Sequence, residues 1–570
     1  MEGPTRSALA WARARAPEAA AALVGVGWFL AVGGWRTVSV TSLEWARGDQ
    51  VQHVLGWLFF RRSAWGLPLG RIDGLAWPVG TTVGYTDANP LLAIPAKLLS
   101  PVLPERFQYI GLWLCLCYGL QGWFGARLAG LASSRAAWRL LCGVLFALSP
   151  VLLARRSHDT LCAHGALLAL LYLNLRGDAD PRSARRGIIG AAALSLALAA
   201  VHPYLAFMAL ALSASLLARL ALCDRAIPRR RAIRAFLTIL VGQIALLGIQ
   251  GYFTSAPSHA PGFGRFTADL LAFVNPFGAS SLLPDLPVIP EEWEGNAYLG
   301  AGGILVVLAG LALAIASRGR STAPGDGRCR WPICAVTAGM ALFAVSPVVH
   351  AAGREVVSWH RVARALQPIA GAIHSSGRFI WPLYYLLLAA ALAGIARGLR
   401  RWPAVATSVV ALAVALQLAD LGPRAVGAHF RPSRWMLRAP EWALARGRYD
   451  LVALYPPLVV GVWSRCRGLE WGDDEAWVPL AEMAYEQRMA INSAQLARGF
   501  GKRLEVGCDA LARAVESGRF PTRTVFVVHP SKLASFQGRP GAACGRVEGY
   551  HVCVASAQDD AFRRALAREY

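Results

Sequence analysis

Residues 187–218 read GIIGAAALSLALAAVHPYLAFMALALSASLLA, and this stretch decides the fold class. It contains no Asp, Glu, Lys or Arg, and it exceeds the roughly 20 apolar residues that a helix needs to cross a bilayer. Pro203 lacks the N–H for a helical hydrogen bond, so we expect two spans that meet at residues 201–204. One kinked span is the alternative, and it would invert the sidedness of everything that follows.

Similar apolar runs recur along the 570-residue chain, which is 55% hydrophobic and only 16% charged. Soluble globular proteins carry about 25% charged residues, so the composition excludes a cytosolic enzyme, a disordered protein and a coiled coil. We predict a mainly α, polytopic membrane helix bundle of about eleven spans. The predicted spans are 20–40, 108–126, 140–154, 160–175, 187–201, 204–218, 235–254, 298–317, 331–350, 379–396 and 402–421.

The basic residues predict the sidedness of the bundle. With the N-terminus inside, the inner segments hold 23 Lys and Arg in 77 residues, whereas the outer loops hold 12 in 144. This bias follows the positive-inside rule and accounts for most of the net charge of +24, so we expect no nucleic-acid partner. The Arg and Ala bias is typical of GC-rich bacterial genomes. We therefore expect a multi-pass protein of the bacterial inner membrane with a cytoplasmic N-terminus.

An odd number of spans places the C-terminus outside. Residues 1–421 then form the transmembrane domain, with long outer loops at 41–107 and 255–297, and residues 422–570 form an extracytoplasmic domain. Three strand-like runs, 451–455, 524–528 and 550–554, alternate with helical stretches such as 509–517. This alternation predicts a small α/β domain.

Cysteine positions agree with that sidedness. Seven of the eleven Cys lie in or beside the spans, where a Cys is usually an inert small apolar residue. The other four, Cys466, Cys508, Cys544 and Cys553, lie in the C-terminal domain and predict two disulfides in an oxidising compartment. We favour Cys544–Cys553, because Gly549 can turn two strands between them. The absence of any CxxC pair disfavours a zinc site.

The first outer loop carries the most informative polar residues. Asp49 follows a glycine at the expected start of a helix, and apolar residues continue from Val51 to Phe60. We expect a helix along the membrane surface, with Asp49 and His53 on one side because they are four residues apart. Asp87, in the polar turn 84–90, is a second candidate acid. Helix capping and turn chemistry are the structural alternatives for the two acids.

Further polar residues share the predicted outer face. Arg155 and Arg156 oppose the inside bias of positive charge, which favours an acidic partner such as a lipid phosphate. Arg378 lies at the expected interface depth, where contact of its side chain with headgroups is the alternative. Supporting histidines are His158 and His202. The acidic loop 291–296 either binds a cation or is simply solvated, and solvation is the favoured interpretation.

Several of these motifs together resemble a known superfamily. They are Gly48-Asp49, the run 57–61, Tyr85-Thr86-Asp87, Phe107-Gln108-Tyr109, Ser376-Gly377-Arg378-Phe379 and the C-terminal run 490–498. With an inside start and an outer C-terminal domain, the chain resembles the glycosyltransferase C (GT-C) superfamily, within a family of bacterial membrane proteins close to it. The resemblance implies an inverting membrane glycosyltransferase that moves a sugar from a polyprenyl-phosphate donor to a glycan, lipid or protein acceptor.

The resemblance also implies roles for particular residues. Asp49 would be the general base or metal-site acid, with Asp87 as the next acid, and Arg378, Arg155 and Arg156 would stabilise the donor phosphate. The sequence lacks the paired-acid motif of some members, so it leaves a divalent cation open. The alternatives are a non-catalytic scaffold for envelope assembly and a transporter or flippase of lipid-linked glycans. Transport is disfavoured because the spans contain few charged residues.

Overall fold

The computed structural model describes residues 4–33, 35–178, 180–254, 263–316, 329–370, 373–427, 435–461, 468–497, 502–555 and 560–567. The chain divides into two compact units. Unit 1 comprises residues 1–38, 110–245 and 259–430, and unit 2 comprises residues 39–109, 246–258 and 431–570. Because the first long loop and the C-terminal segment share unit 2, this division differs from a single boundary near residue 421.

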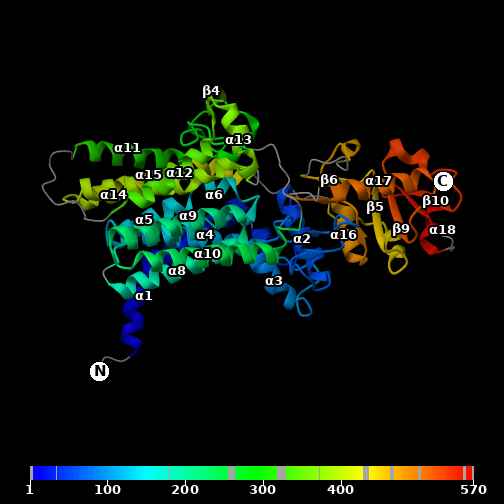
Figure 1. Cartoon of the computed structure of the whole chain (residues 1–570), viewed down its shortest axis with the longest axis horizontal. Helices are drawn as coiled ribbons and strands as arrows, with labels where there is room; N and C mark the ends of the chain where they lie inside the picture. The colour runs from blue at the N-terminus through cyan, green and yellow to red at the C-terminus, as the bar shows by residue number, and fades with distance from the viewer. Residues whose placement is uncertain are drawn as a thin grey trace. The chain divides into compact units, whose positions relative to one another are not determined.

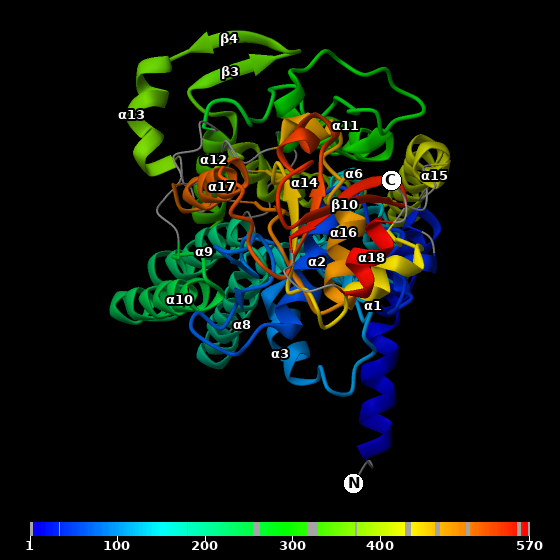
Figure 2. The ribbon, with the colours of Figure 1, turned by 90° about the vertical axis from the view of Figure 1, so that its right-hand side faces the viewer.

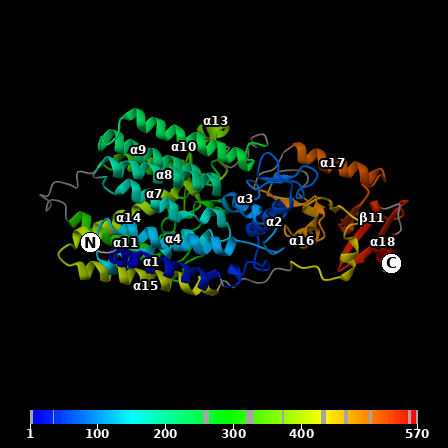
Figure 3. The same ribbon diagram turned by 90° about the horizontal axis from the view of Figure 1, so that it is seen from below.

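Unit 1 consists mainly of helices that run side by side (Figures 1 and 3). They are α1 (Pro4–Gly33), α4 (Ile110–Ala129), α5 (Ala136–Ala147), α6 (Pro150–Ala154), α7 (His164–Leu175), α8 (Pro181–Val201), α9 (Pro203–Ala218), α10 (Arg229–Gln250), α11 (Gly300–Ala316), α12 (Trp331–Val345), α14 (Trp381–Gly398) and α15 (Pro403–Gly427). A helix lies in each predicted span. Among the described residues, seven helices are long and apolar enough to cross a membrane. A membrane protein is therefore indicated, whereas the count of eleven spans and the sidedness stay predictions.

Small residues allow the helices of unit 1 to approach closely. A Cβ added at Gly25 of α1 would overlap the carbonyl of Tyr118 in α4, and one at Gly122 of α4 would overlap the carbonyl of Ala21. Glycine at such positions brings two helix backbones into contact, which is the usual basis of helix association in membranes.

The stretch 187–218 forms two helices, as the more favoured prediction states. Helix α8 ends at Val201, His202 adopts an extended backbone, and α9 begins at Pro203. The two helices pack against each other, and the hydroxyls of Ser195 and Ser213 lie 2.8 Å apart across the pair. Gln243 of α10 donates to the carbonyls of Ser195 and Ala206, which fixes the third helix against this hairpin.

Shorter elements connect the helices of unit 1. Between α12 and α14, the antiparallel strands β3 (Val348–Ala351) and β4 (Arg354–Ser358) are followed by α13 (His360–Ala370), as Figure 2 shows. Three 3-10 turns, η2 (Asp159–Cys162), η4 (Pro290–Gly295) and η5 (Ser376–Ile380), carry polar residues that are described below.

Unit 2 is built around α2 (Asp49–Arg62). Every residue of α2 from Gln50 to Phe60 is buried, so the prediction of a helix lying along the membrane surface is wrong. A helix that is apolar around most of its circumference needs cover on all sides. Here α3 (Pro90–Leu98) covers one side, and α16 (Val478–Glu486) of the C-terminal segment covers another. The short strands β1 (Arg71–Ile72) and β2 (Thr81–Thr82) also belong to this unit.

The C-terminal segment contributes a mixed sheet with the order β10-β11-β9-β5-β7. Its strands are β5 (Leu451–Tyr455), β7 (Ala490–Ile491), β9 (Thr524–Val528), β10 (Ala542–Val547) and β11 (Tyr550–Ala555), and β6 (Val459–Val460) pairs separately with β8 (Ala494–Gln495). Helices α17 (Lys502–Glu516) and α18 (Ala561–Ala567) complete the segment. The predicted strands and the small α/β region are confirmed.

Disulfides confirm one predicted pair and add another. Cys544 and Cys553 face each other in the β10–β11 hairpin, where Glu548 and Gly549 form the turn with positive φ, and their sulfurs are bonded. Cys508 is also disulfide-bonded, whereas Cys466 lies outside the described residues. The second described pair, Cys223–Cys329, joins two cysteines of unit 1 that the sequence analysis treats as inert.

Candidate functional sites

The first candidate site begins at the N-terminus of α2. Gly48 occupies the N-cap position with φ of 53°, and its N–H donates to the Glu475 carboxylate over 2.6 Å. Asp49 is therefore the first helical residue rather than the cap. The side chain of Gln495 donates to Asp49 Oδ1 over 3.1 Å. Gln495 comes from the C-terminal run 490–498 noted in the sequence, of which the last residue lies outside the described part of the chain.

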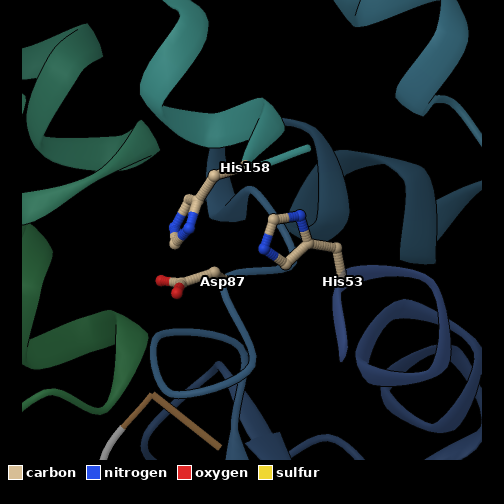
Figure 4. A group of neighbouring side chains, drawn as sticks. All are labelled: His53, Asp87 and His158. Carbon is tan, nitrogen blue, oxygen red and sulfur yellow. The ribbon is translucent and has the colours of Figure 1, made fainter. Parts of the chain in front are cut away.

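One turn along α2, buried side chains extend toward the polar turn 84–90. Gln52 donates to the carbonyl of Tyr85 over 3.2 Å, and its amide nitrogen lies 3.4 Å from Asp87 Oδ2. Figure 4 shows the side chains of His53 and Asp87, whose nearest ligand-type atoms lie within 4.8 Å of each other. His158, which the figure also labels, belongs to unit 1 and is described there. The structure thus brings Asp87 and His53 together within unit 2.

The turn that carries Asp87 is unusual in its backbone. Asp87 and Asn89 both have positive φ, of 48° and 51°, and both are buried. Such residues cost free energy and persist where surrounding contacts fix them, which is frequent at functional sites. Three contacts fix this turn: the N–H of Ala497 donates to the carbonyl of Tyr85, the Tyr85 hydroxyl donates to Tyr252, and the Tyr109 hydroxyl donates to Ala88.

Asn89 is a residue that sequence reasoning missed as a candidate. Its side chain is fully buried, and neither the amide oxygen nor the amide nitrogen makes a hydrogen bond to another described residue. An unsatisfied buried amide is costly, so a native one calls for an unseen partner such as water or a ligand. Asn89 precedes Pro90, and an Asn-Pro pair is a turn signal that explains the backbone but does not predict a ligand.

The second candidate site lies in unit 1 and is called here the arginine–glutamate cluster: Arg155, Glu294 and Arg378. Arg378 Nε and Nη2 donate to the two oxygens of Glu294 over 2.8 and 2.9 Å. Arg155 Nη1 donates to Glu294 Oε2 over 2.8 Å, and its Nη2 donates to the carbonyls of Trp293 and Glu294. The side chain of Arg155 is 1% exposed and that of Arg378 is 8% exposed, so the cluster is buried.

Aromatic rings surround the cluster. The Arg155 guanidinium lies 4.3 Å from the Trp293 ring and 5.3 Å from the Trp381 ring, and Arg378 lies 4.7 Å from the ring of Tyr204. Cation–π contacts of this kind are strongest when water is excluded. Burial alone would raise the pKa of Glu294, but the charges of Arg378 and Arg155 outweigh it, and the pKa lies well below its usual value. The cluster therefore carries two positive charges and one negative charge.

These contacts correct the interpretation of loop 291–296 as a solvated acidic loop. Glu294 neutralises one of the two arginines of the cluster, both of which were predicted, with Arg156, to stabilise a donor phosphate. Glu292 is fully buried beside His350, with Oε1 and Nδ1 3.0 Å apart. Glu291 is half-buried and pairs with Arg265. The sequence could not reveal this, because acidic side chains in a loop give no signal for burial.

The remaining basic candidates of unit 1 have structural contacts. Arg156 Nη1 donates to the carbonyl of Val32 over 2.8 Å, near the C-terminal end of α1. The rings of His158 and His202 lie 5.7 Å apart. His202 Nδ1 accepts from the N–H of Tyr204 over 3.2 Å at the start of α9. Since Tyr204 also contacts Arg378, the two histidines extend the surroundings of the cluster.

The helices and the C-terminal sheet define the chain as a multi-pass membrane protein with an additional α/β region. It belongs to the DUF6311 family, because the model of that family, described as a domain of unknown function, matches residues 22–422. A second model, the DUF6311 C-terminal domain, matches residues 441–555. No curated protein matches the chain.

Proposed function

We propose that the chain is a membrane glycosyltransferase that moves a sugar from a polyprenyl-phosphate donor to an envelope acceptor on the outer face of the membrane. The observation that carries the proposal is the gathering of acids at the first turns of α2. Asp49 begins this helix, and Gln52, one turn later, reaches Asp87 from a separate part of the same loop. The resemblance to the GT-C superfamily assigns its acid to this loop.

The proposed reaction is one inverting displacement. The acceptor hydroxyl attacks the anomeric carbon, the bond from that carbon to the phosphate oxygen breaks, and polyprenyl phosphate leaves with the bonding electrons. Asp49 accepts the proton of the hydroxyl, since it is partly exposed and held by Gln495. The leaving phosphate gains negative charge and needs a positive partner. A divalent cation on Asp87 and His53, which belong to the same unit as Asp49, fits this role.

Turnover of a panel of polyprenyl-phosphate sugars by the purified chain tests the proposal. Asp49→Asn keeps size but removes basicity, so activity should fall by roughly 10²–10⁴-fold while thermal unfolding stays unchanged. Glu44→Gln, in the same loop, is the matched control and should retain full turnover. If Asp87 and His53 hold a cation, chelation should abolish turnover and added Mn²⁺ or Mg²⁺ should restore it.

Two outcomes would oppose the proposal. Full turnover by both Asp49→Asn and Asp87→Asn would remove the acid–base mechanism. Absence of turnover with every donor, together with donor-independent assembly of envelope glycans around the chain, would favour the non-catalytic scaffold.

A further inference from the structure

Unit 2 contains a cavity of about 610 Å³. None of the residues that line it belongs to the two candidate sites described above. Its lining comes from the end of α2, the segment after α3, and the end of α16. Cavities of this size are typical of small-ligand sites. The wall includes two aromatic rings, Phe59 and Tyr485, whose centroids lie 5.9 Å apart. The polar part of the wall consists of Arg61, Arg62, Ser63, Asp73, Ser100, Glu105 and Arg488.

Most charges of this wall are satisfied within the protein. Arg61 donates to four backbone carbonyls, among them those of Pro104 and Leu103. Arg62 pairs with Glu105 and stacks on Tyr485, with its guanidinium 3.7 Å from the ring centroid. Asp73 pairs with Arg71. Arg488 differs, because its exposed guanidinium makes no hydrogen bond or ion pair to any described residue, although its charge helps to lower the pKa of Glu105.

The backbone of Arg488 singles it out further. It has φ of 61° and follows the C-cap of α16, where its N–H donates to the carbonyl of Tyr485 and the N–H of Met489 donates to that of Ala484. This is the Schellman pattern of helix termination, in which the left-handed residue is usually glycine. An arginine there is strained relative to glycine. The side chain of Arg488 lines the cavity. Strained backbone positions are frequent at binding sites, so the strain supports a binding role for Arg488.

We propose that this cavity binds an acidic saccharide, one that carries a carboxylate or a phosphate, with Arg488 as the residue that recognises the anion. A guanidinium forms planar, charge-assisted hydrogen bonds with either group. Phe59 contributes apolar surface to the wall, and one face of Tyr485 is covered by the Arg62 guanidinium. The serine hydroxyls and the carboxylates of Asp73 and Glu105 accept hydrogen bonds from sugar hydroxyls. The charges of the wall disfavour a purely apolar ligand.

This inference goes beyond the proposed function and does not rest on it, because the cavity is lined from the C-terminal end of α2, whereas Asp49 begins that helix. Binding is measured without turnover, so the two proposals fail separately. A chain that binds the saccharide but transfers no sugar would remove the transferase and leave the site. A chain that transfers sugar but binds no acidic saccharide would remove the site and leave the transferase.

Isothermal titration of the full chain in nanodiscs tests the site with four probes: methyl glucuronide, glucose 6-phosphate, methyl glucoside and inorganic phosphate. At least one of the acidic sugars should bind tenfold or more tightly than methyl glucoside, as one charge-assisted hydrogen bond predicts. Equal affinity for methyl glucoside would overturn the role of the anion. Inorganic phosphate that binds as tightly as the acidic sugars would overturn the role of the saccharide.

Two substitutions separate recognition from stability. Arg488→Gln keeps the backbone strain and removes the charge, so it should weaken binding of the acidic sugar about tenfold without changing the melting temperature. Arg488→Gly should weaken binding equally but raise the melting temperature, because glycine suits the left-handed position. The matched control is Arg523→Gly. Arg523 also has positive φ, of 55°, but pairs with Asp450 and does not line the cavity. Wild-type affinity in Arg488→Gln would overturn the proposal.

Discussion

The arginine–glutamate cluster shows how strongly a single buried charge depends on its neighbours. Glu294 holds two guanidiniums at once, and it does so in a site that excludes most water. Removing one partner of a buried ion pair is far more damaging than removing a surface pair, because the remaining charge stays buried without compensation.

Glu294→Gln should therefore destabilise the protein by about 3–5 kcal/mol, since Arg155 and Arg378 would lose their shared carboxylate. Thermal unfolding of the purified protein in detergent measures this change. Glu291→Gln is the control in the same loop. Glu291 pairs with Arg265 near the surface, and the loss should stay below about 1 kcal/mol. Equal melting temperatures for the two variants would show that Glu294 does not balance the arginines.

Glu292 predicts a pH dependence of stability. Burial raises the pKa of this carboxyl to about 7, and the nearby Asp269 adds to the shift. Between the unfolded pKa near 4.3 and the folded value, the folded state binds a proton that the unfolded state lacks, so stability falls as pH rises through this window. Glu292→Gln should reduce the loss of stability between pH 5 and pH 8, by about 3 kcal/mol at most. Melting temperatures at the two pH values measure it, and an unchanged difference would contradict the shift.

At the scale of elements, the sequence predicted which segments are helical better than it predicted what covers them. The run from Val51 to Phe60 indicates an apolar helix, and α2 is one. The position of that helix depends on α16 and on the run 490–498, which are hundreds of residues away in the chain. No local pattern encodes that contact, so the surface of the membrane was the more obvious place for an apolar helix in a loop.

Close packing of α2 gives a test of this arrangement. A Cβ at Gly56 would overlap the side chain of Thr86, which precedes Asp87. Gly56→Ala should therefore cost about 1–3 kcal/mol through overpacking, and it should lower any activity that depends on Asp87. In α17, a Cβ at Gly507 would meet Pro78 and Val79 at ordinary distances of 3.4 to 3.9 Å, so Gly507→Ala should be neutral or slightly stabilising. Thermal unfolding compares the two, and a harmless Gly56→Ala would show that α2 lies elsewhere.

The hairpin α8–α9 shows where sequence reasoning is strongest. A proline in a charge-free run is a local signal with a local effect, and the break occurs at His202, directly before Pro203. The candidate sites are the features that sequence reasoning predicted least well. Arg155 and Arg378 were both identified from their positions, but their shared partner Glu294 was assigned to solvent, because nothing in the sequence joins the three.

At the scale of the whole molecule, the disulfides Cys223–Cys329 and Cys544–Cys553 test which side of the membrane each part of the chain faces. The predicted topology places Cys223 and Cys329 on the cytoplasmic side and Cys544 and Cys553 outside. Because cytosolic thiols are kept reduced, this topology predicts that the Cys223–Cys329 disulfide of the structure is open in intact cells, so a permeant maleimide should label both cysteines. Cys544 and Cys553 should react only after reduction, as mass spectrometry would reveal. Protection of the first pair with labelling of the second would invert the topology.

Composition and charge sufficed to predict a membrane protein with a separate α/β region, because both are sums over many residues. They did not predict the division into units. The loop 39–109 and the segment 431–570 form one unit through contacts such as those of Arg62 with Tyr485 and of Asp49 with Gln495. Such pairings have no signature in one sequence, since each partner alone is an ordinary polar or aromatic residue.

Unit 2 is built from segments that are far apart in the chain, and this affects how the protein folds during its synthesis. Arg62 and Tyr485 are separated by 423 residues, and a ribosome that adds about 5–20 residues per second needs roughly 20 to 80 s to make that stretch. Throughout this interval the newly made α2 has no C-terminal segment to cover it. Its apolar side chains must therefore be shielded by a chaperone or by the lipid surface until the last part of the chain emerges and folds over them.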